Sequence, residues 1–234
     1  MLTDGGYRCV LLARGKERLE AVAAALGADY EVCDVGERAC VERAAAAIRE
    51  RHPALKLLVN NAGVPGRAGF LDADAERIET VTRINYLGGV WCIRAFLPAL
   101  EAAAPSHVVN VVSVAGTVAV GTSGPYTAAK HAQLAFSRSI AAELAPRGVR
   151  VHTVLPGFVE TEGFPQYTVQ PRWMHPFIGQ PEDVARAVVR AIDRNRHEVT
   201  VPRYYRLGTL AQWLAPGLVA RVGRSAAAHM RPPA

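Results

Sequence analysis

Hydrophobic positions along this chain gather into short runs that alternate with longer, alanine-rich amphipathic stretches. Short apolar runs are typical of strands buried on both faces of a parallel sheet, and the longer stretches are typical of the helices that cover it. The predicted strands are residues 8–13, 30–34, 55–60, 107–113, 150–155 and 197–201. The predicted helices are residues 16–26, 37–51, 74–100, 123–145 and 181–194. The alternation predicts a doubly wound α/β fold.

Three helix ends carry signals that are independent of this pattern. Gly27 follows the first predicted helix and suits a left-handed C-terminal cap. Asp74 precedes the third and can accept a hydrogen bond from its first turn. Pro181 opens the fifth, where a missing N–H costs nothing.

The length fits one domain. Half of the 234 residues are apolar, which suffices for one well-covered core. We expect that domain over residues 1–202 and a C-terminal amphipathic helical tail over residues 203–234. The uncharged stretches are shorter than the roughly 20 residues of a transmembrane helix, and no secretory signal opens the chain. A cytoplasmic protein is therefore expected.

Composition excludes several functions. The four cysteines lie in apolar or helical segments without a C-x-x-C pair, and the seven histidines show no metal-ligand spacing, so we predict neither disulfides nor a metal site. The net charge of +6 comes from basic residues spread singly along the chain. Nucleic acid is therefore not an expected partner, and the basic residues near Arg14 fit an anionic small molecule better.

A tyrosine and a lysine four residues apart are the first candidate catalytic groups. Tyr126 and Lys130 lie on one face of a predicted helix. A phenol is a poor base at neutral pH, and an adjacent ammonium favours the phenolate, so Tyr126 is a candidate for proton transfer. Ser113 ends a predicted strand thirteen residues earlier, which brings its hydroxyl towards the start of the same helix.

These residues stand in a set of ordered motifs. The set comprises N-N-A-G at 60–63, Asn85 in R-I-N-Y, Ser113, the Tyr126–Lys130 pair, and P-G-x-V-x-T at 156–161. The sequence resembles the short-chain dehydrogenase/reductase family over about residues 6–201. The resemblance implies a Rossmann-like parallel sheet, hydride transfer between an alcohol and a ketone or aldehyde, and a homo-oligomer, commonly a dimer or tetramer.

The resemblance also implies residue roles. Tyr126 would exchange the proton of the substrate oxygen, Ser113 would hydrogen-bond that oxygen, Lys130 would hold the nicotinamide ribose and lower the pKa of Tyr126, and Asn85 would anchor a water relay. The residues implied to line the cofactor are Asp34, Val35, Asn61, Ala62, Gly63, Tyr126, Lys130, Pro156, Gly157, Val159 and Thr161.

The basic cluster bears on the choice of cofactor. NAD enzymes place a carboxylate at the end of the second strand to bind the ribose 2′-hydroxyl. In this chain residues 8–13 correspond to the family's second strand, which ends at Ala13. Arg14, Lys16 and Arg18 follow Ala13, and these basic residues suit a 2′-phosphate. We therefore predict NADP in preference to NAD, with Arg14 as the phosphate contact. Three solvated basic residues at the start of a helix are the alternative.

The sequence departs from the family at its beginning. The family opens with a strand, a T-G-x-x-x-G-x-G turn and a helix, of which residues 1–6 are at most the last turn. Gly63, Gly66 and Gly69 follow a later strand and do not open a helix, so they are no substitute for that phosphate-binding turn. In the family's strand order the first strand lies between residues 8–13 and 55–60, so two unpaired edges are expected to face each other.

Two hypotheses account for this departure. In the first, the working protein carries roughly 25 to 30 further residues before Met1, because a full βαβ unit needs about 30. In the second, the chain is a truncated, weakly active or inactive binding or scaffold protein, whose sheet rearranges or borrows a strand from another chain. A serine hydrolase centred on Ser113 is disfavoured because no G-x-S-x-G motif surrounds it.

Two further segments have open interpretations. Residues 156–180 form a long irregular stretch with Phe158, Phe164, Tyr167, Trp173 and Phe177, which predicts either an apolar substrate wall or an ordinary surface loop. In the tail, apolar residues fall on one helical face, with arginines at the flanks and Pro216 as a helix breaker. These apolar residues are Leu207, Leu210, Ala211, Leu214 and Leu218. The face predicts packing on its own domain or a second subunit, or a helix on a membrane surface.

Overall fold

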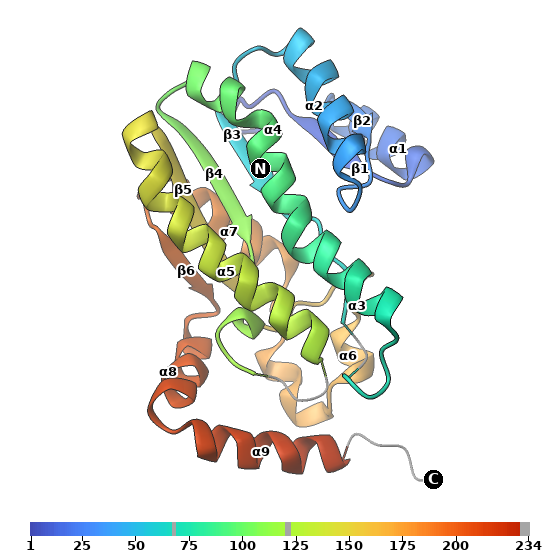
Figure 1. Cartoon of the computed structure of the whole chain (residues 1–234), viewed down its shortest axis with the longest axis vertical. Coiled ribbons are helices and arrows are strands. Elements are labelled where there is room, and N and C mark those ends of the chain that lie inside the picture. The colour runs from blue at the N-terminus through green and yellow to red at the C-terminus, as the bar shows by residue number, and fades with distance from the viewer. Residues whose placement is uncertain (67–68, 120–122, 230–234) are drawn as a thin grey trace.

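The chain folds into parallel strands covered by helices, as the hydrophobic pattern predicts (Figure 1). The computed structural model describes residues 1–66, 69–119 and 123–229, with the backbone alone for residues 223–229. The strands are β1 (Val10–Ala13), β2 (Asp29–Val32), β3 (Leu57–Asn60), β4 (Ser106–Val111), β5 (Val149–Pro156) and β6 (Glu198–Val201). All the pairings between these strands are parallel.

The predicted helices are present with small shifts at their ends. The observed helices are α1 (Lys16–Leu26), α2 (Arg38–Arg51), α3 (Ala75–Thr82), α4 (Gly88–Ala102), α5 (Gly124–Leu144), α6 (Gln166–Val169), α7 (Pro181–Asp193), α8 (Arg206–Leu214) and α9 (Pro216–His229). The single helix predicted over residues 74–100 is α3 and α4 joined by a π-helical turn, Arg83–Leu87. The predicted irregular stretch also contains α6 and a 3₁₀ segment, Arg172–Phe177.

The signalled helix ends are confirmed. Gly27 caps α1 in the left-handed conformation, with φ of 60°. The carboxylate of Asp74 accepts a hydrogen bond of 2.7 Å from the backbone N–H of Arg77. Pro181 opens α7, where Gln180 and Asp183 form a reciprocal capping box.

The six strands form two sheets instead of one. β1 pairs with β2, and the other four strands follow the order β3-β4-β5-β6. Within the described part of the chain, no ladder joins β1 to β3, so the predicted gap in strand pairing is present at that position.

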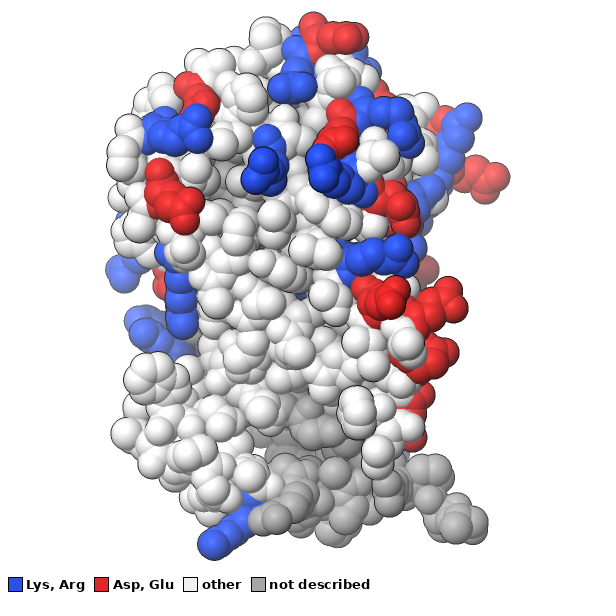
Figure 2. All heavy atoms as spheres, in the orientation of Figure 1, with Lys and Arg blue, Asp and Glu red and all other residues white. Residues whose placement is uncertain are grey.

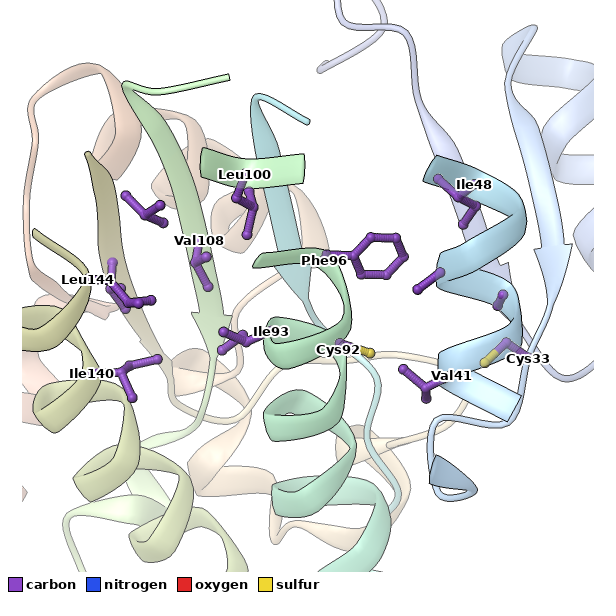
Figure 3. Packing of buried hydrophobic residues seen from close by; sticks show 14 residues of the cluster. Cys33, Val41, Ile48, Cys92, Ile93, Phe96, Leu100, Val108, Ile140 and Leu144 are labelled. Carbon is purple, nitrogen blue, oxygen red and sulfur yellow. The ribbon is translucent and has the colours of Figure 1, made fainter. Parts of the chain in front are cut away.

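Helix packing joins the two sheets. Val41 and Ile48 of α2 are buried against Phe96 of α4, in one cluster that continues to Val108 of β4 and Leu144 of α5. Figure 3 shows the ring of Phe96 directed from α4 towards α2, across the space between the sheets. Dispersion and burial of these side chains hold β1, β2 and α2 on the rest of the domain without backbone pairing.

Helices cover both faces of the larger sheet. Val108 of β4 faces α4 and α5, whereas its neighbour Val109 packs against Ala187 and Val188 of α7. The alternation of adjacent side chains produces these two layers. Among the described helices, none combines the length and the apolar character needed to cross a membrane.

A buried polar chain crosses the same sheet. The Asn60 side chain donates to Asn110 at 2.9 Å, and Asn110 donates to the hydroxyl of Ser137 at 2.9 Å. Ser137 and Thr153 then share a hydrogen bond of 2.7 Å. Because every member has a partner, the chain ties β3, β4, α5 and β5 together without an unpaired buried group between them.

Candidate active site

Ser113 lies where two central strands end. It follows β4 by two residues, and its Oγ accepts a hydrogen bond of 3.1 Å from the N–H of Ala115. The same hydroxyl donates to the carbonyl of Pro156, the last residue of β5, at 3.4 Å. The carboxyl edge of a parallel sheet is where such folds bind ligands, and this contact fixes a hydroxyl there.

Tyr126 occupies the first turn of α5, beside a closely passing loop. A Cβ added to Gly66 would lie 2.1 Å from the Cβ of Tyr126, so only glycine permits this approach. The ring of Tyr126 lies 6.3 Å from that of Phe164, in the segment after β5. The phenol is therefore held between the loop after β3 and an aromatic side chain of the predicted apolar wall.

Lys130 lies one turn further along α5 and is buried. Its Nζ donates to Oε1 of Gln133 at 2.8 Å and to the carbonyl of Val111 at 3.4 Å. The ammonium is 5.8 Å from the centre of the Tyr126 ring. Burial lowers the pKa of Lys130 from 10.5 to about 7, because both hydrogen-bond partners are neutral and the charged form is poorly solvated.

The pKa of Tyr126 moves in the direction opposite to the prediction. Burial raises the pKa of the phenol, and interaction with the Ser113 hydroxyl lowers it only in part. Lys130 does not offset the effect of burial, since its own charge is weakened by the same desolvation. In this structure the phenol is thus held in its protonated form at neutral pH.

Asn85 lies in the π-helical turn and is almost completely buried. Its Nδ2 donates to the carbonyls of Val64 and Val81, each at 3.1 Å, and its Oδ1 accepts from the N–H of Val64 at 3.2 Å. The side chain therefore holds the loop that follows β3. Asn61, Ala62 and Gly63 of this loop are exposed, so their backbone is accessible to a ligand.

A second group of predicted residues lies at the ends of β1 and β2. Arg14 is 60% exposed and its Nη1 lies 3.7 Å from the carboxylate of Asp34. Asp34 also accepts a 2.8 Å hydrogen bond from the N–H of Gly36. A Cβ added to Gly88 would lie 2.9 Å from the carbonyl oxygen of Val35, so this group contacts the helix that begins just after Asn85.

The other two basic residues of the cluster have closer or local partners. Arg18 pairs with Glu162 at 2.7 Å, and Lys16 pairs with Glu20 of the next turn at 3.8 Å. Arg18, Glu162 and Lys16 are more than half exposed, and Glu20 somewhat less. Exposed ion pairs of this kind are weak, so another anion readily replaces the carboxylate. Arg14 is the cation of the cluster placed directly at the strand end.

The motif after β5 is braced by a residue that the sequence did not indicate. The ring of Tyr205 lies so close to Gly157 that an added Cβ would be 2.1 Å from it. Its hydroxyl donates to the carbonyl of Phe177 at 3.1 Å and lies 3.4 Å from the N–H of Phe158. Tyr205 falls in the predicted C-terminal tail, and no sequence motif connects it with residues 156–161.

The remaining residues of that motif form short local contacts. Val159 pairs with Gly179 in an isolated parallel bridge, and Thr161 Oγ1 accepts from the N–H of Phe164 at 3.0 Å. Gln133, the partner of Lys130, was also missed. Its position three residues after Lys130 on one helical face is the only signal in the sequence for this contact.

The site residues therefore form a strip along the carboxyl edges of both sheets, interrupted between β1 and β3, where no ladder joins the described strands. One end is Arg14 and Asp34, the middle is Asn61 to Gly63 with Asn85, and the other end contains Ser113, Tyr126 and Lys130. The strip offers a cation at an exposed strand end and a protonated phenol beside a hydroxyl.

Comparisons with known proteins agree with this arrangement. Residues 1–170 match the short chain dehydrogenase family. A rat protein named 17-beta-hydroxysteroid dehydrogenase 13 is 29% identical, with 86% of this chain and 68% of the rat protein aligned. The bovine short-chain dehydrogenase/reductase 3 is 34% identical over 74% of this chain and 57% of its own length.

A solved structure extends the likeness to three dimensions. The alcohol dehydrogenase of the archaeon Thermococcus sibiricus, complexed with 5-hydroxy-NADP, superposes with a TM-score of 0.73 at 26% identity, covering 82% of each chain. The chain thus spans 57% to 68% of the two mammalian relatives. The family match over residues 1–170, with the likeness in sequence and fold, establishes that this chain belongs to the short-chain dehydrogenase family.

Proposed function

We propose that this protein is an NADP-preferring oxidoreductase that interconverts an alcohol and a ketone or aldehyde on a fairly apolar small molecule. The observation that carries the proposal is the partly buried Tyr126 phenol, with Ser113 and Lys130 beside it at the carboxyl edge of the sheet. Membership of an oxidoreductase family supports the reaction class.

The donor set fits the two ribose ends of a nicotinamide cofactor, whereas the glycine-rich turn that binds the pyrophosphate in this family has no counterpart among the described residues. Lys130 is a buried ammonium with only neutral partners, so it has the capacity to bind ribose hydroxyls. The exposed backbone from Asn61 to Gly63 and the exposed Arg14 extend the same strip towards the adenine end. A bound cofactor would supply or accept the hydride, and the similar archaeal enzyme is complexed with 5-hydroxy-NADP.

The protein's own residues then handle the substrate oxygen and its proton. Ser113 donates a hydrogen bond to that oxygen, and Tyr126 transfers its phenolic proton to it as negative charge develops. The protonated phenol is the form that donates this proton in carbonyl reduction, and in alcohol oxidation the same group accepts it. Phe164 against the Tyr126 ring favours an apolar group on the substrate.

The first experiment is a titration of the 234-residue chain with NADPH, followed by tryptophan fluorescence, with NADH as the control. Saturable binding that favours NADPH is the expected result. Apolar ketones are then screened with wild type and with Tyr126→Phe, which should bind NADPH normally and lose about 10²- to 10⁴-fold in kcat. A folded chain that binds neither nucleotide would refute the proposal.

A further inference from the structure

Helix α8 is amphipathic, but its polar face lies against the protein and its apolar face is exposed. Its polar side chains face the protein: Thr209 shares a 2.8 Å hydrogen bond with Thr117, and Oε1 of Gln212 accepts from the N–H of Ala119 at 3.3 Å. Its apolar side chains face outward, where Leu207, Trp213 and Leu214 are 69%, 82% and 76% exposed. Of the three alternatives predicted for this face, packing on its own domain is not what the structure shows, which leaves a second subunit or a membrane surface.

The exposed apolar surface continues onto α9. The two helices are separated by a break just before Pro216, as predicted, and Leu218 and Val222 of α9 are 59% and 62% exposed. By contrast, α7 buries Ala187 and Val188 against the sheet. We call the outward residues Leu207, Leu210, Trp213, Leu214, Leu218 and Val222 the tail patch.

The tail patch also adjoins the wall of the candidate site. Trp173 and Phe177, from the segment after β5, line an open apolar pocket of about 240 Å³ together with Tyr204, just before α8, and Gly208 of α8. Figure 1 places α6, α8 and α9 at the same end of the molecule. In the view of Figure 2, most of the charged side chains lie towards the other end and along one side, and a basic side chain is visible at the described part of this end.

The charge of the tail is of one sign. Residues 203–234 contain five arginines and no aspartate or glutamate, so they account for nearly all of the net charge of +6. Arg203, Arg206 and Arg221 are exposed beside the tail patch. A two-fold contact through α8 and α9 would bring these arginines together with no carboxylate from residues 203–234 to pair them, whereas anionic headgroups would neutralise them.

We propose that the tail patch docks on an anionic lipid surface. The apolar side chains, with Trp213 among them, enter the boundary between headgroups and acyl chains, and the flanking arginines bind lipid phosphates. This orientation turns the apolar pocket beside the candidate site towards the lipid. The proposal rests on α8 and α9 and does not depend on the proposed reaction.

Vesicle flotation tests the proposal directly. The purified chain should float with vesicles of phosphatidylcholine mixed with phosphatidylglycerol and should stay at the bottom with pure phosphatidylcholine. High salt should reduce the floating fraction, because the arginine contribution is screened. Equal flotation on both vesicle types, or on neither, would overturn the proposal.

Matched variants distinguish binding through the tail patch from non-specific binding through any exposed apolar side chain. Leu210→Glu with Leu214→Glu changes two outward side chains and should lower the floating fraction about tenfold or more. Val22→Glu with Leu26→Glu changes two exposed apolar residues of α1 and should leave it unchanged. Light scattering of the same samples, without vesicles, measures whether the patch instead binds a second copy of the chain. If the wild type is a dimer and Leu210→Glu with Leu214→Glu is a monomer, the patch is a dimer interface and the proposal is wrong.

Discussion

His107 Nδ1 lies 2.9 Å from His152 Nε2 inside the larger sheet, with the two rings stacked 5.2 Å apart. His152 is fully buried, and its Nδ1 lies 2.8 Å from the carbonyl oxygen of Arg196. A carbonyl only accepts, so Nδ1 of His152 carries the proton and its Nε2 accepts from the N–H of His107. This network requires His152 to be neutral and His107 to carry a proton on Nδ1.

The pair predicts a loss of stability in mild acid. Burial lowers the pKa of both histidines below 6.5, and the nearby positive charge of Arg150 adds to the effect. As the pH falls below about 6.5, the unfolded chain binds protons that the folded chain does not, so the free energy of unfolding falls, by up to about 1.4 kcal/mol per pH unit for each histidine. Denaturant unfolding between pH 7 and pH 5 measures this slope.

Two variants assign the slope to the pair. His152→Asn removes one buried titrating ring and should flatten the pH dependence, whatever its effect on stability at pH 7. His131→Gln, at an exposed position of α5, should keep the wild-type slope. An unchanged slope in His152→Asn would show that other groups are responsible.

The burial of Lys130 lowers the stability of the protein, although the proposed activity requires this residue. Its pKa is about 7 in the folded chain and 10.5 in the unfolded chain, so stability falls as the pH is lowered from about 10.5 to 7, where only the unfolded chain is fully charged. Lys130→Met should therefore raise the melting temperature at pH 7 while it abolishes cofactor binding and activity. The stabilisation should shrink towards pH 10, and a variant less stable at pH 7 would contradict the inferred cost of burial.

Gly66 predicts a loss of function through the backbone. A methyl group there would meet the Cβ of Tyr126 at 2.1 Å, so Gly66→Ala must displace either the loop or the tyrosine. We expect a destabilisation of about 1 to 3 kcal/mol and a lower kcat. Gly163→Ala is the matched control, because its added Cβ meets nothing within 4 Å; thermal unfolding and turnover of both variants decide the matter.

We predict that Arg14 determines the preference of the protein for NADPH over NADH. Removing a charge-assisted contact to the 2′-phosphate in Arg14→Ala should weaken NADPH binding about tenfold to a hundredfold and leave NADH binding almost unchanged. Arg8 lies just before β1, is exposed and pairs with Asp29. Arg8→Ala should therefore change the affinity for neither nucleotide. Equal weakening of both nucleotides by Arg14→Ala would remove this residue from the phosphate site.

The family assignment was possible from the sequence because five motifs occur in order at the ends of predicted strands and helices. The roles of single residues were less predictable. Asn85 was expected to anchor a water relay, yet its amide hydrogens and Oδ1 bind Val64 and Val81 of the protein itself. Residues 67–68 and 120–122, which border the loops around Tyr126, lie outside the described structure.

The sequence by itself determined the elements of this protein, because strand and helix periods, caps and breakers such as Gly27, Asp74 and Pro216 act through near neighbours in the chain. Only the tertiary structure decided the quantities that depend on distant neighbours. Burial from several elements raises the pKa of Tyr126 and lowers that of Lys130, Tyr205 packs on Gly157 from 48 residues away, and α8 turns its leucines outward. Burial and desolvation are set by the packing around a side chain, and a linear pattern does not specify that packing.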